Sequence, residues 1–448
     1  MRSLVSSQKR IFIIGIWIAS VCGWMNYGWA EDRAKLLETR SDIADAGIAL
    51  TERSQHSLDM AFFHFAEDRT GWVAIHQMLR AAQRGAKVRL IIDGGIRQRE
   101  LKRSTIAYLQ ENGVEIRIFH ERKLFKPFSW HNQRLHDKMV LSDGRAAIFP
   151  TGNIKDNYYT HKPLIPGMAH HRFNDVALYV EGDVVQEAQS YFEELWKSGE
   201  VESPTSRKIS VSERQNITKQ LELYSRVSRA WIHGGRTARD IQKALDDLIP
   251  VEEARFFHDP IGQKGKIAGA EVPILELIRT AKTELLIENP YVVLTPPFEK
   301  AFQEAADKKV QTTLMTNSPH GSDQMTTAYR YEAERHKFPG MGESAMIVER
   351  NASEGMQHAK VFAKDGEYMI VTSMNLDPRS LNLNNEIGIS FRSRQLVTQL
   401  RDRIEKLKET STIYRGENNA KLDAKLSIPR SIQRCSLLLL GAVTRSQL

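Results

Sequence analysis

One short motif occurs twice in the sequence, and this repeat constrains the fold more than any other feature. The motif is a histidine, a lysine two residues later and an aspartate five residues after the lysine. The first copy is His136, Lys138 and Asp143, and the second is His358, Lys360 and Asp365. The two histidines lie 222 residues apart, which is the length of a domain. A chain of 448 residues is also too long for one ordinary core. The sequence therefore predicts two similar lobes.

Hydrophobic patterning predicts the same order of elements before each motif. The order strand, amphipathic helix, strand is expected for residues 57–63, 70–85 and 86–93, and again for residues 284–287, 298–308 and 310–316. Strands that alternate with helices are typical of the α/β class. We expect each lobe to be a mixed β-sheet flanked by helices, with one active site at the interface between the lobes.

The remaining segments suggest how the chain is divided. The predicted parts are a signal peptide or N-terminal anchor (1–30), a first lobe (31–205), a helical and loop linker (206–265), a second lobe (266–412) and a basic C-terminal tail (413–448). Residues 183–196 are expected to close the first lobe as a helix. Within the linker, residues 207–247 are expected to be helical, and the glycine-containing stretch 253–269 to be a loop.

The first thirty residues have the layout of a secretory signal. Lys9 and Arg10 precede an apolar run that ends near Trp24, and the small residues Gly28 and Ala30 suit a cleavage site. An uncleaved membrane anchor is the alternative, because the apolar run approaches the length of a short span.

The residue types of the repeated motif suit chemistry on a phosphodiester. Residues i and i+2 of a strand point to the same face, so the histidine and lysine of each copy should project together. The aspartate of each copy is followed by a glycine, and an Asp-Gly pair is a hairpin signal. The strand expected after each pair ends in a polar cluster. This cluster contains Asn153 in the first copy, and Ser373 and Asn375 in the second.

Phosphodiester attack needs a nucleophile, an acid for the leaving oxygen and positive groups around the phosphate. One histidine would attack phosphorus and form a phosphohistidine, while the other would serve as acid and then as base. The two lysines and the amides of Asn153 and Asn375 would hold the phosphate oxygens. Asp143 and Asp365 are expected to orient a histidine or a lysine.

We predict no cofactor and no metal ion, because the lysines would supply the positive charge that a metal otherwise brings. His161, His170 and His171 could be taken for a metal cluster, but no cysteine or carboxylate stands at ligand spacing beside them. A solvated loop is the better interpretation of these histidines.

These residues resemble those of the phospholipase D superfamily, and within it the bacterial cardiolipin synthases of phospholipase D type. The resemblance covers residues 35–410, and is most specific in the runs Leu376-Asp377-Pro378-Arg379-Ser380 and Asn384-Asn385-Glu386-Ile387-Gly388. In the first half it includes Gly152-Asn153-Ile154 and Asn174-Asp175-Val176. Met374 and Thr151 depart from it, since they replace an aromatic residue and a glycine of the family pattern.

The resemblance implies metal-independent transfer through phosphohistidine, with His136 as nucleophile and His358 as acid and base. It also implies that Asp175 and Glu386 lie near the histidine of each lobe and could orient it. The implied function is that of a cardiolipin synthase-like phosphatidyltransferase or a hydrolytic phospholipase D. Such an enzyme would be exported to the periplasm or to the outer face of the inner membrane of a bacterium.

The expected partners are a phospholipid such as phosphatidylglycerol and a membrane surface, and a monomer is expected because one chain holds both motifs. The formal charge of +8 suits any phosphate-bearing partner. Nucleic acid is not expected, although an exported endonuclease of the same superfamily stays open as an alternative, as does a non-catalytic lipid-binding module. Aromatic and lysine residues before the first motif could form a lipid-facing lip or simply pack within a loop: Lys123, Phe125, Lys126, Phe128 and Trp130.

Overall fold

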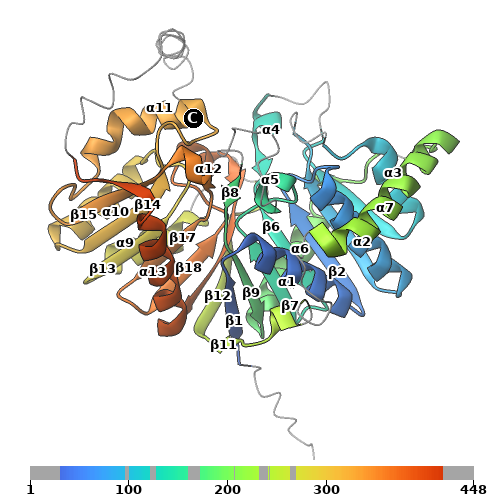
Figure 1. Cartoon of the computed structure of the whole chain (residues 1–448), viewed down its shortest axis with the longest axis horizontal. Coiled ribbons are helices and arrows are strands. Elements are labelled where there is room, and N and C mark those ends of the chain that lie inside the picture. Colours follow the sequence, from blue (N-terminus) through green and yellow to red (C-terminus); the bar gives the residue numbers. More distant parts are fainter. Residues whose placement is uncertain are drawn as a thin grey trace, which may run out of the picture.

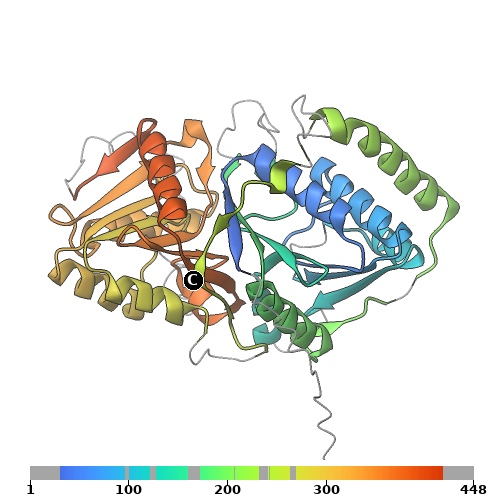
Figure 2. The same cartoon turned by 90° about the horizontal axis from the view of Figure 1, so that it is seen from below.

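The structure is a computed structural model that describes residues 31–95, 100–121, 128–159, 172–205, 207–231, 241, 243–262 and 269–416. Two lobes lie side by side, each a β-sheet flanked by helices (Figure 1; Figure 2). The predicted α/β class is confirmed, with one mixed sheet of nine strands and one of eight. None of the described helices is both long and apolar enough to cross a bilayer. The predicted signal peptide or anchor, most of the basic tail and the three histidines at 161, 170 and 171 lie outside the described residues.

The first sheet has the strand order β10-β4-β3-β2-β6-β7-β9-β1-β11. Strands β2, β3 and β4 are parallel, and the remaining pairs are antiparallel. The strands are β1 (Arg33–Leu37), β2 (Ser57–Phe62), β3 (Lys87–Asp93), β4 (Val114–Phe119), β6 (Lys138–Ser142), β7 (Ala146–Pro150), β9 (Ala177–Glu181), β10 (Val201–Glu202) and β11 (Ile249–Pro250). The helices of this lobe are α1 (Arg40–Arg53), α2 (Arg69–Gln83), α3 (Arg103–Glu111), α4 (Phe128–Asn132), α5 (Asp156–Tyr159), α6 (Val184–Lys197) and α7 (Val211–Trp231), and a 3₁₀ turn spans Lys243–Leu245.

The second sheet has the order β12-β20-β18-β17-β13-β14-β15-β21. Its strands are β12 (Glu252–His258), β13 (Glu284–Glu288), β14 (Gln311–Asn317), β15 (Ala345–Arg350), β17 (Val361–Lys364), β18 (Tyr368–Thr372), β20 (Ile387–Arg392) and β21 (Ser411–Tyr414). Its helices are α9 (Glu271–Thr280), α10 (Pro296–Asp307), α11 (Met325–Glu334), α12 (Pro378–Asn382) and α13 (Arg394–Lys408), with 3₁₀ turns at Arg335–Lys337 and Ala352–Glu354.

The two sheets repeat one topology, as the repeated motif predicts. The strand order of the second sheet, taken from β21 to β12, corresponds strand by strand to the order of the first sheet from β10 to β1. Each sheet contains three adjacent parallel strands, β2, β3 and β4 in the first and β13, β14 and β15 in the second. The predicted strand, helix, strand series coincides with β2, α2 and β3 in one lobe and with β13, α10 and β14 in the other. Each motif therefore occupies the same place in its own sheet, at the start of β6 or β17.

The prediction of a loop at 253–269 is wrong for its first residues, because Glu252–His258 forms strand β12. Ala254 and Phe256 are buried while Arg255 between them is exposed, which is the alternation of a strand. Glu253 has a φ of 53°, and the pairing with β20 shifts register there, so a bulge interrupts the alternation. The second sheet thus begins inside the predicted linker, and β21 likewise extends past the predicted start of the tail at residue 413.

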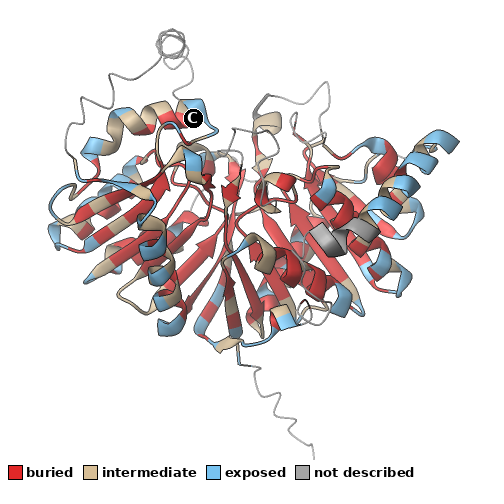
Figure 3. Ribbon diagram, viewed as in Figure 1, coloured by how far each residue is buried: buried red, intermediate tan, exposed pale blue. Residues whose placement is uncertain are grey.

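The lobes share one hydrophobic core. Buried side chains from β7, β9 and α6 join those from β12, β18, β20 and α13 in a single cluster. Across the seam the Phe256 ring lies 5.8 Å from that of Phe149 and 5.6 Å from that of Tyr191, between ring centroids. Figure 3 shows buried residues running through both sheets to the line where the lobes meet. Apolar surface hidden in this way fixes the orientation of one lobe against the other.

Phe256→Ala should therefore destabilise the whole chain. A large buried side chain truncated to alanine costs about 3–5 kcal/mol of unfolding free energy. Denaturant unfolding followed by fluorescence and by circular dichroism would measure the change, with Val211→Ala on an exposed helix position as control. Loss of structure in the second lobe alone, with the first lobe unaffected, would contradict a shared core.

Candidate active site

Each motif histidine follows a two-residue strand that pairs with the opposite lobe. Strand β5 (Arg134–Leu135) pairs in parallel with β19 (Asn384–Asn385), and β16 (Met356–Gln357) pairs in parallel with β8 (Phe173–Asn174). The backbone N–H of His136 donates to the carbonyl of Asn385 at 2.9 Å, and that of His358 donates to the carbonyl of Asn174 at 2.8 Å. The backbone of each histidine is therefore fixed by the other lobe.

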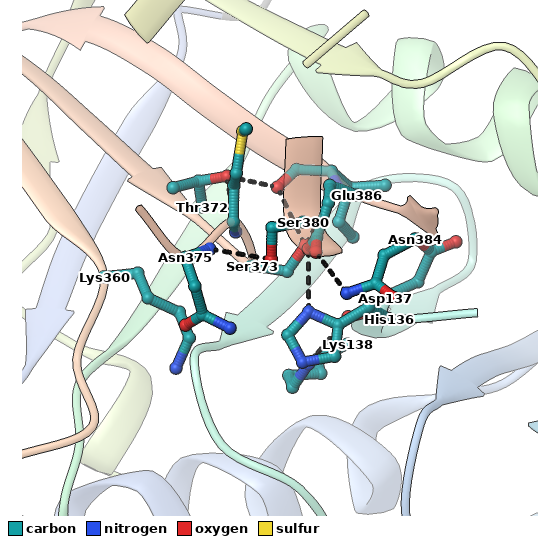
Figure 4. A network of polar contacts seen from close by, with 12 residues as sticks. His136, Asp137, Lys138, Lys360, Thr372, Ser373, Asn375, Ser380, Asn384 and Glu386 are labelled. Carbon is teal, nitrogen blue, oxygen red and sulfur yellow. Dashed lines mark hydrogen bonds and ion pairs between the residues drawn. The ribbon is translucent and has the colours of Figure 1, made fainter. Parts of the chain in front are cut away.

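The side chains cross the seam in the same way. His136 Nδ1 lies 2.8 Å from Glu386 Oε2, and His358 Nδ1 lies 3.2 Å from Asp175 Oδ1. All four residues are buried. The carboxylate of each lobe thus orients the histidine of the other lobe, which leaves Nε2 of each ring without a carboxylate partner among the described residues (Figure 4 shows the His136 pair).

Hydroxyl groups hold the two carboxylates. Ser373 Oγ donates to Glu386 Oε2 at 2.5 Å, and Thr151 Oγ1 donates to Asp175 Oδ1 at 2.5 Å. Asn384 Nδ2 donates to the second oxygen of Glu386 at 3.0 Å. Ser373, which the sequence places in the polar cluster after the second motif, therefore contacts the orienting carboxylate. Thr151 was not predicted as a site residue, although its place in the first copy matches that of Ser373 in the second.

The two lysines are buried beside the histidines. Each Nζ donates to the backbone carbonyl of its own motif histidine at 2.6 Å, and Lys360 Nζ also lies 3.3 Å from His358 Nε2. Burial lowers the pKa of Lys138 to about 8 and that of Lys360 to about 7. Burial first, and then the charges of Lys138 and Lys360, lower the pKa of His136 well below its usual value. The centre therefore brings two lysines together beside two neutral histidines, and the lysines can donate to the oxygens of an anion.

The two predicted phosphate-holding amides differ in their contacts. Asn153 Oδ1 accepts from the backbone N–H of His64 at 3.1 Å, and its Nδ2 donates to the hydroxyl of Tyr158 at 3.1 Å. Asn375 Oδ1 is buried without a hydrogen-bond partner among the described residues, and its amide lies beside Lys360 (Figure 4). Asn375 is therefore the amide that remains available to a substrate.

The expectation that Asp143 and Asp365 orient a motif histidine or lysine is wrong. Asp143 accepts from the backbone N–H groups of Gln55, His56 and Ser57, at 2.7–3.0 Å. Asp365 accepts in the same way from 282–284, at 2.7–3.3 Å. The physical reason is that each aspartate follows the far end of its motif strand. Asp143 is five positions beyond Lys138, or about 16 Å at the usual rise of a strand.

These aspartates instead pin the hairpin that carries each motif. Asp143 and Gly144 both have positive φ, as do Asp365 and Gly366, which is the backbone of the tight turns that the Asp-Gly pairs predict. The carboxylate then ties this turn to the start of the neighbouring strand, β2 or β13.

Asp137, between the first histidine and lysine, was not singled out from the sequence. It is completely buried and accepts from the hydroxyl of Tyr191 on α6 at 2.6 Å. Burial raises its pKa to about 8, so it is protonated at neutral pH. Its counterpart in the second copy is Ala359. The described residues include no group of three histidine, cysteine or acidic side chains able to hold a metal ion.

Among the residues of the proposed lipid-facing lip, the structure describes the side chain of Trp130. This side chain packs against the protein. Its ring stacks on that of His120, with 3.7 Å between centroids, and its carbonyl lies 2.8 Å from His120 Nδ1. For Trp130, loop packing is therefore the correct interpretation. Lys123, Phe125, Lys126 and the side chain of Phe128 lie outside the described residues.

A family model described as "Cardiolipin synthase, PLD-like domain" matches residues 48–196 and 274–408 of this chain. The chain belongs to the phospholipase D superfamily. The two matched segments correspond to the two lobes, so the resemblance inferred from the motifs is confirmed, and the chain is a cardiolipin synthase-like enzyme of this superfamily.

Two relatives and one solved structure illustrate the similarity. Cardiolipin synthase C of Escherichia coli is 25% identical over 401 residues, covering 80% of this chain and 81% of that protein. A probable cardiolipin synthase of Bacillus subtilis is 24% identical over 404 residues, covering 89% and 69%. The crystal structure of a phosphatidylserine synthase from Haemophilus influenzae matches with a TM-score of 0.66 at 12% identity, covering 94% of this chain and 98% of that one. This last match shows that the fold is shared.

Glu386→Gln and Asp175→Asn should each reduce turnover of a soluble phosphodiester by about 10²- to 10⁴-fold, because a neutral amide no longer selects the productive ring tautomer. Glu304→Gln, at a half-exposed ion pair in the second lobe, is the matched control. Initial rates at saturating substrate would measure the loss. Unchanged rates in both site variants would contradict the crossed pairing.

Asp143→Ala should destabilise the chain by about 2 kcal/mol while leaving turnover of the folded enzyme within about twofold, because the lost contacts are to backbone N–H groups. Asp143→Asn keeps an acceptor oxygen and should lose less. Burial would raise the pKa of Asp143, but the three N–H donors lower it overall. Its stabilisation is therefore present above the unfolded pKa and is lost as pH falls through the folded value. Denaturation curves at neutral pH and at about pH 3 should show the difference between wild type and Asp143→Ala shrinking.

Proposed function

We propose that the enzyme transfers a phosphatidyl group between alcohols without a metal ion, as a cardiolipin synthase-like phosphatidyltransferase. The observation that carries the proposal is the pair of buried histidines, each held through Nδ1 by a carboxylate of the other lobe. With Nδ1 of each ring bonded to a carboxylate, the two Nε2 atoms would act on one phosphate, as in-line displacement at phosphorus requires.

In the first step His136 Nε2 attacks phosphorus, the bond from phosphorus to the leaving alcohol oxygen breaks, and His358 gives its Nε2 proton to that oxygen. In the second step His358 takes the proton of the incoming alcohol, whose oxygen attacks phosphorus and displaces His136. Water in place of the second alcohol gives hydrolysis, so exclusion of water decides the balance between the two outcomes.

The electrostatics support this assignment of the two histidines. The pKa of His136 is held well below its usual value, which keeps a neutral nucleophile. The pKa of His358 is lowered by burial and by Lys360, but the charge of Asp175 opposes this effect. The charge of Asp175 favours the protonated form of His358, as the role of acid requires. Lys138 and Lys360, together with the Nδ2 group of Asn375, would donate hydrogen bonds to the phosphate oxygens.

The family of this chain suggests the substrate. Relatives named cardiolipin synthases support a phosphatidyl donor and a glycerol-type acceptor such as phosphatidylglycerol. We also propose that the enzyme works as a monomer on a membrane surface after export, at the periplasmic face of the inner membrane.

A product assay tests the reaction. The purified full-length chain would be incubated with phosphatidylglycerol vesicles and EDTA, and the lipids resolved by mass spectrometry. Cardiolipin is the expected product, and His136→Ala and His358→Ala should each abolish it. Phosphatidic acid alone would assign a hydrolase. Unchanged lipid, with DNA cleaved in a parallel reaction, would overturn the proposal in favour of the endonuclease.

The pH profile tests the role of Lys360. Its pKa of about 7 means that it is charged below that pH and loses its charge as pH rises. We expect kcat/KM to fall as pH rises through about 7–8. The fall in kcat should come at higher pH, because a bound phosphate anion raises the pKa of the lysine. A kcat/KM that is flat up to pH 9 would contradict a charged Lys360 in substrate binding.

A further inference from the structure

Four arginines from both lobes converge on the seam behind the catalytic centre. They are Arg40 at the start of α1, Arg172 before β8, Arg350 at the end of β15 and Arg403 on α13. Figure 1 shows α1 and α13 on either side of the line where the lobes meet. The convergence brings positive charge from elements far apart in the sequence to one place.

The contacts of these arginines surround the paired strands β8 and β16. Arg40 Nε donates to the carbonyl of Phe173 at 3.0 Å, and Arg350 Nη2 donates to that of Glu354 at 3.2 Å. The carbonyl of Arg172 accepts from the backbone N–H of Met356 at 2.7 Å. The cluster therefore lies against the short strands that precede Asp175 and His358.

Arg403 reaches the same place from the second lobe. Its Nε lies 3.0 Å from Glu288 Oε1, and its Nη1 donates to the carbonyl of Glu38 in the first lobe at 2.9 Å. Glu288 also bonds the amide of Gln357, the residue directly before His358. The cluster is thus connected to the residue before His358 through the side chains of Glu288 and Gln357.

Two of the four arginines, Arg40 and Arg350, form no ion pair with a carboxylate among the described residues. Of the nearby carboxylates, Glu288 is paired with Arg403 and Asp175 with His358, while Glu354 acts on Arg350 only at longer range. Burial, and then the charge of Arg172, lower the pKa of Arg40 to about 10.

Two guanidinium N–H groups in this cluster are also unsatisfied. Arg350 Nε and Arg403 Nη2 are buried with no hydrogen-bond partner among the described residues, and Arg350 is only 6% exposed. A buried donor left without an acceptor costs free energy, and guanidinium groups are suited to the oxygens of phosphate. Arg40 and Arg172 are half-buried, which gives the cluster an edge at the surface.

We propose that the four arginines form a second, non-catalytic site that binds a phosphate-type oxyanion and clamps the two lobes together at β8 and β16. Inorganic phosphate and the headgroup of an anionic phospholipid share the required chemistry. By holding Gln357 and Asn174, occupancy would fix His358 and Asp175. The site is independent of which phosphodiester the histidines use.

Phosphate titrations monitored by thermal unfolding test the site. Because the catalytic lysines also attract phosphate, the titration uses the full-length Lys138→Gln/Lys360→Gln chain at constant ionic strength. We expect inorganic phosphate to raise the Tm of this chain. Adding Arg40→Gln or Arg350→Gln should weaken phosphate binding by at least about tenfold, whereas Arg394→Gln, which is 86% exposed, should leave it unchanged.

A second titration with phosphatidylglycerol in phosphatidylcholine vesicles distinguishes the two sources of the anion. A Tm shift with these vesicles but not with phosphate, again lost in Arg40→Gln, would assign a lipid headgroup. Circular dichroism without phosphate identifies any variant that fails to fold, and Arg40→Lys, which keeps the charge but not the planar fork, then replaces it. The absence of a shift with either probe in the double-lysine variant, or a shift that both arginine variants retain, would overturn the proposal.

Discussion

The crossed bonds between each histidine and the carboxylate of the opposite lobe are the constraint on which the rest of the structure depends. Neither lobe contains an oriented histidine by itself, because Glu386 holds His136 and Asp175 holds His358. The lobes must therefore dock in one orientation, and the shared core around Phe256 stabilises that orientation. Because the two sheets have the same topology, corresponding elements of the two lobes form both histidine–carboxylate contacts.

Burial of charge gives this interface its chemical character. Two lysines and two histidines stand in a poorly hydrated centre, where their charges depress one another's pKa values. Glu386 and Asp175 provide negative charge beside the two lysines, and each of them also orients a histidine. Farther along the same seam lies the cluster of four arginines, for which we propose a second site for an anion.

The twofold repeat is broken where the chemistry requires two different roles. Asn153 has both ends of its amide engaged, whereas Asn375 keeps an open oxygen beside Lys360. Asp137 occupies the middle of the first motif, buried and protonated, where the second motif has Ala359. Burial lowers the pKa of both histidines, but the charge of Asp175 opposes this effect at His358. The environments of the two histidines therefore differ, as the two roles that we propose for them require.

The sequence alone determined the repeat, the α/β class and the residues of both motifs, because periodicity and motif spacing are local properties of the chain. It failed at β12, where a bulge at Glu253 hides the alternation, and at Asp143 and Asp365, whose distance from the histidines depends on the length of a strand. Only the tertiary structure decided that each carboxylate orients the histidine of the other lobe and that four distant arginines meet. The reason is physical: these contacts join residues some 180 to 360 positions apart, and packing of the two sheets alone brings them within hydrogen-bond reach.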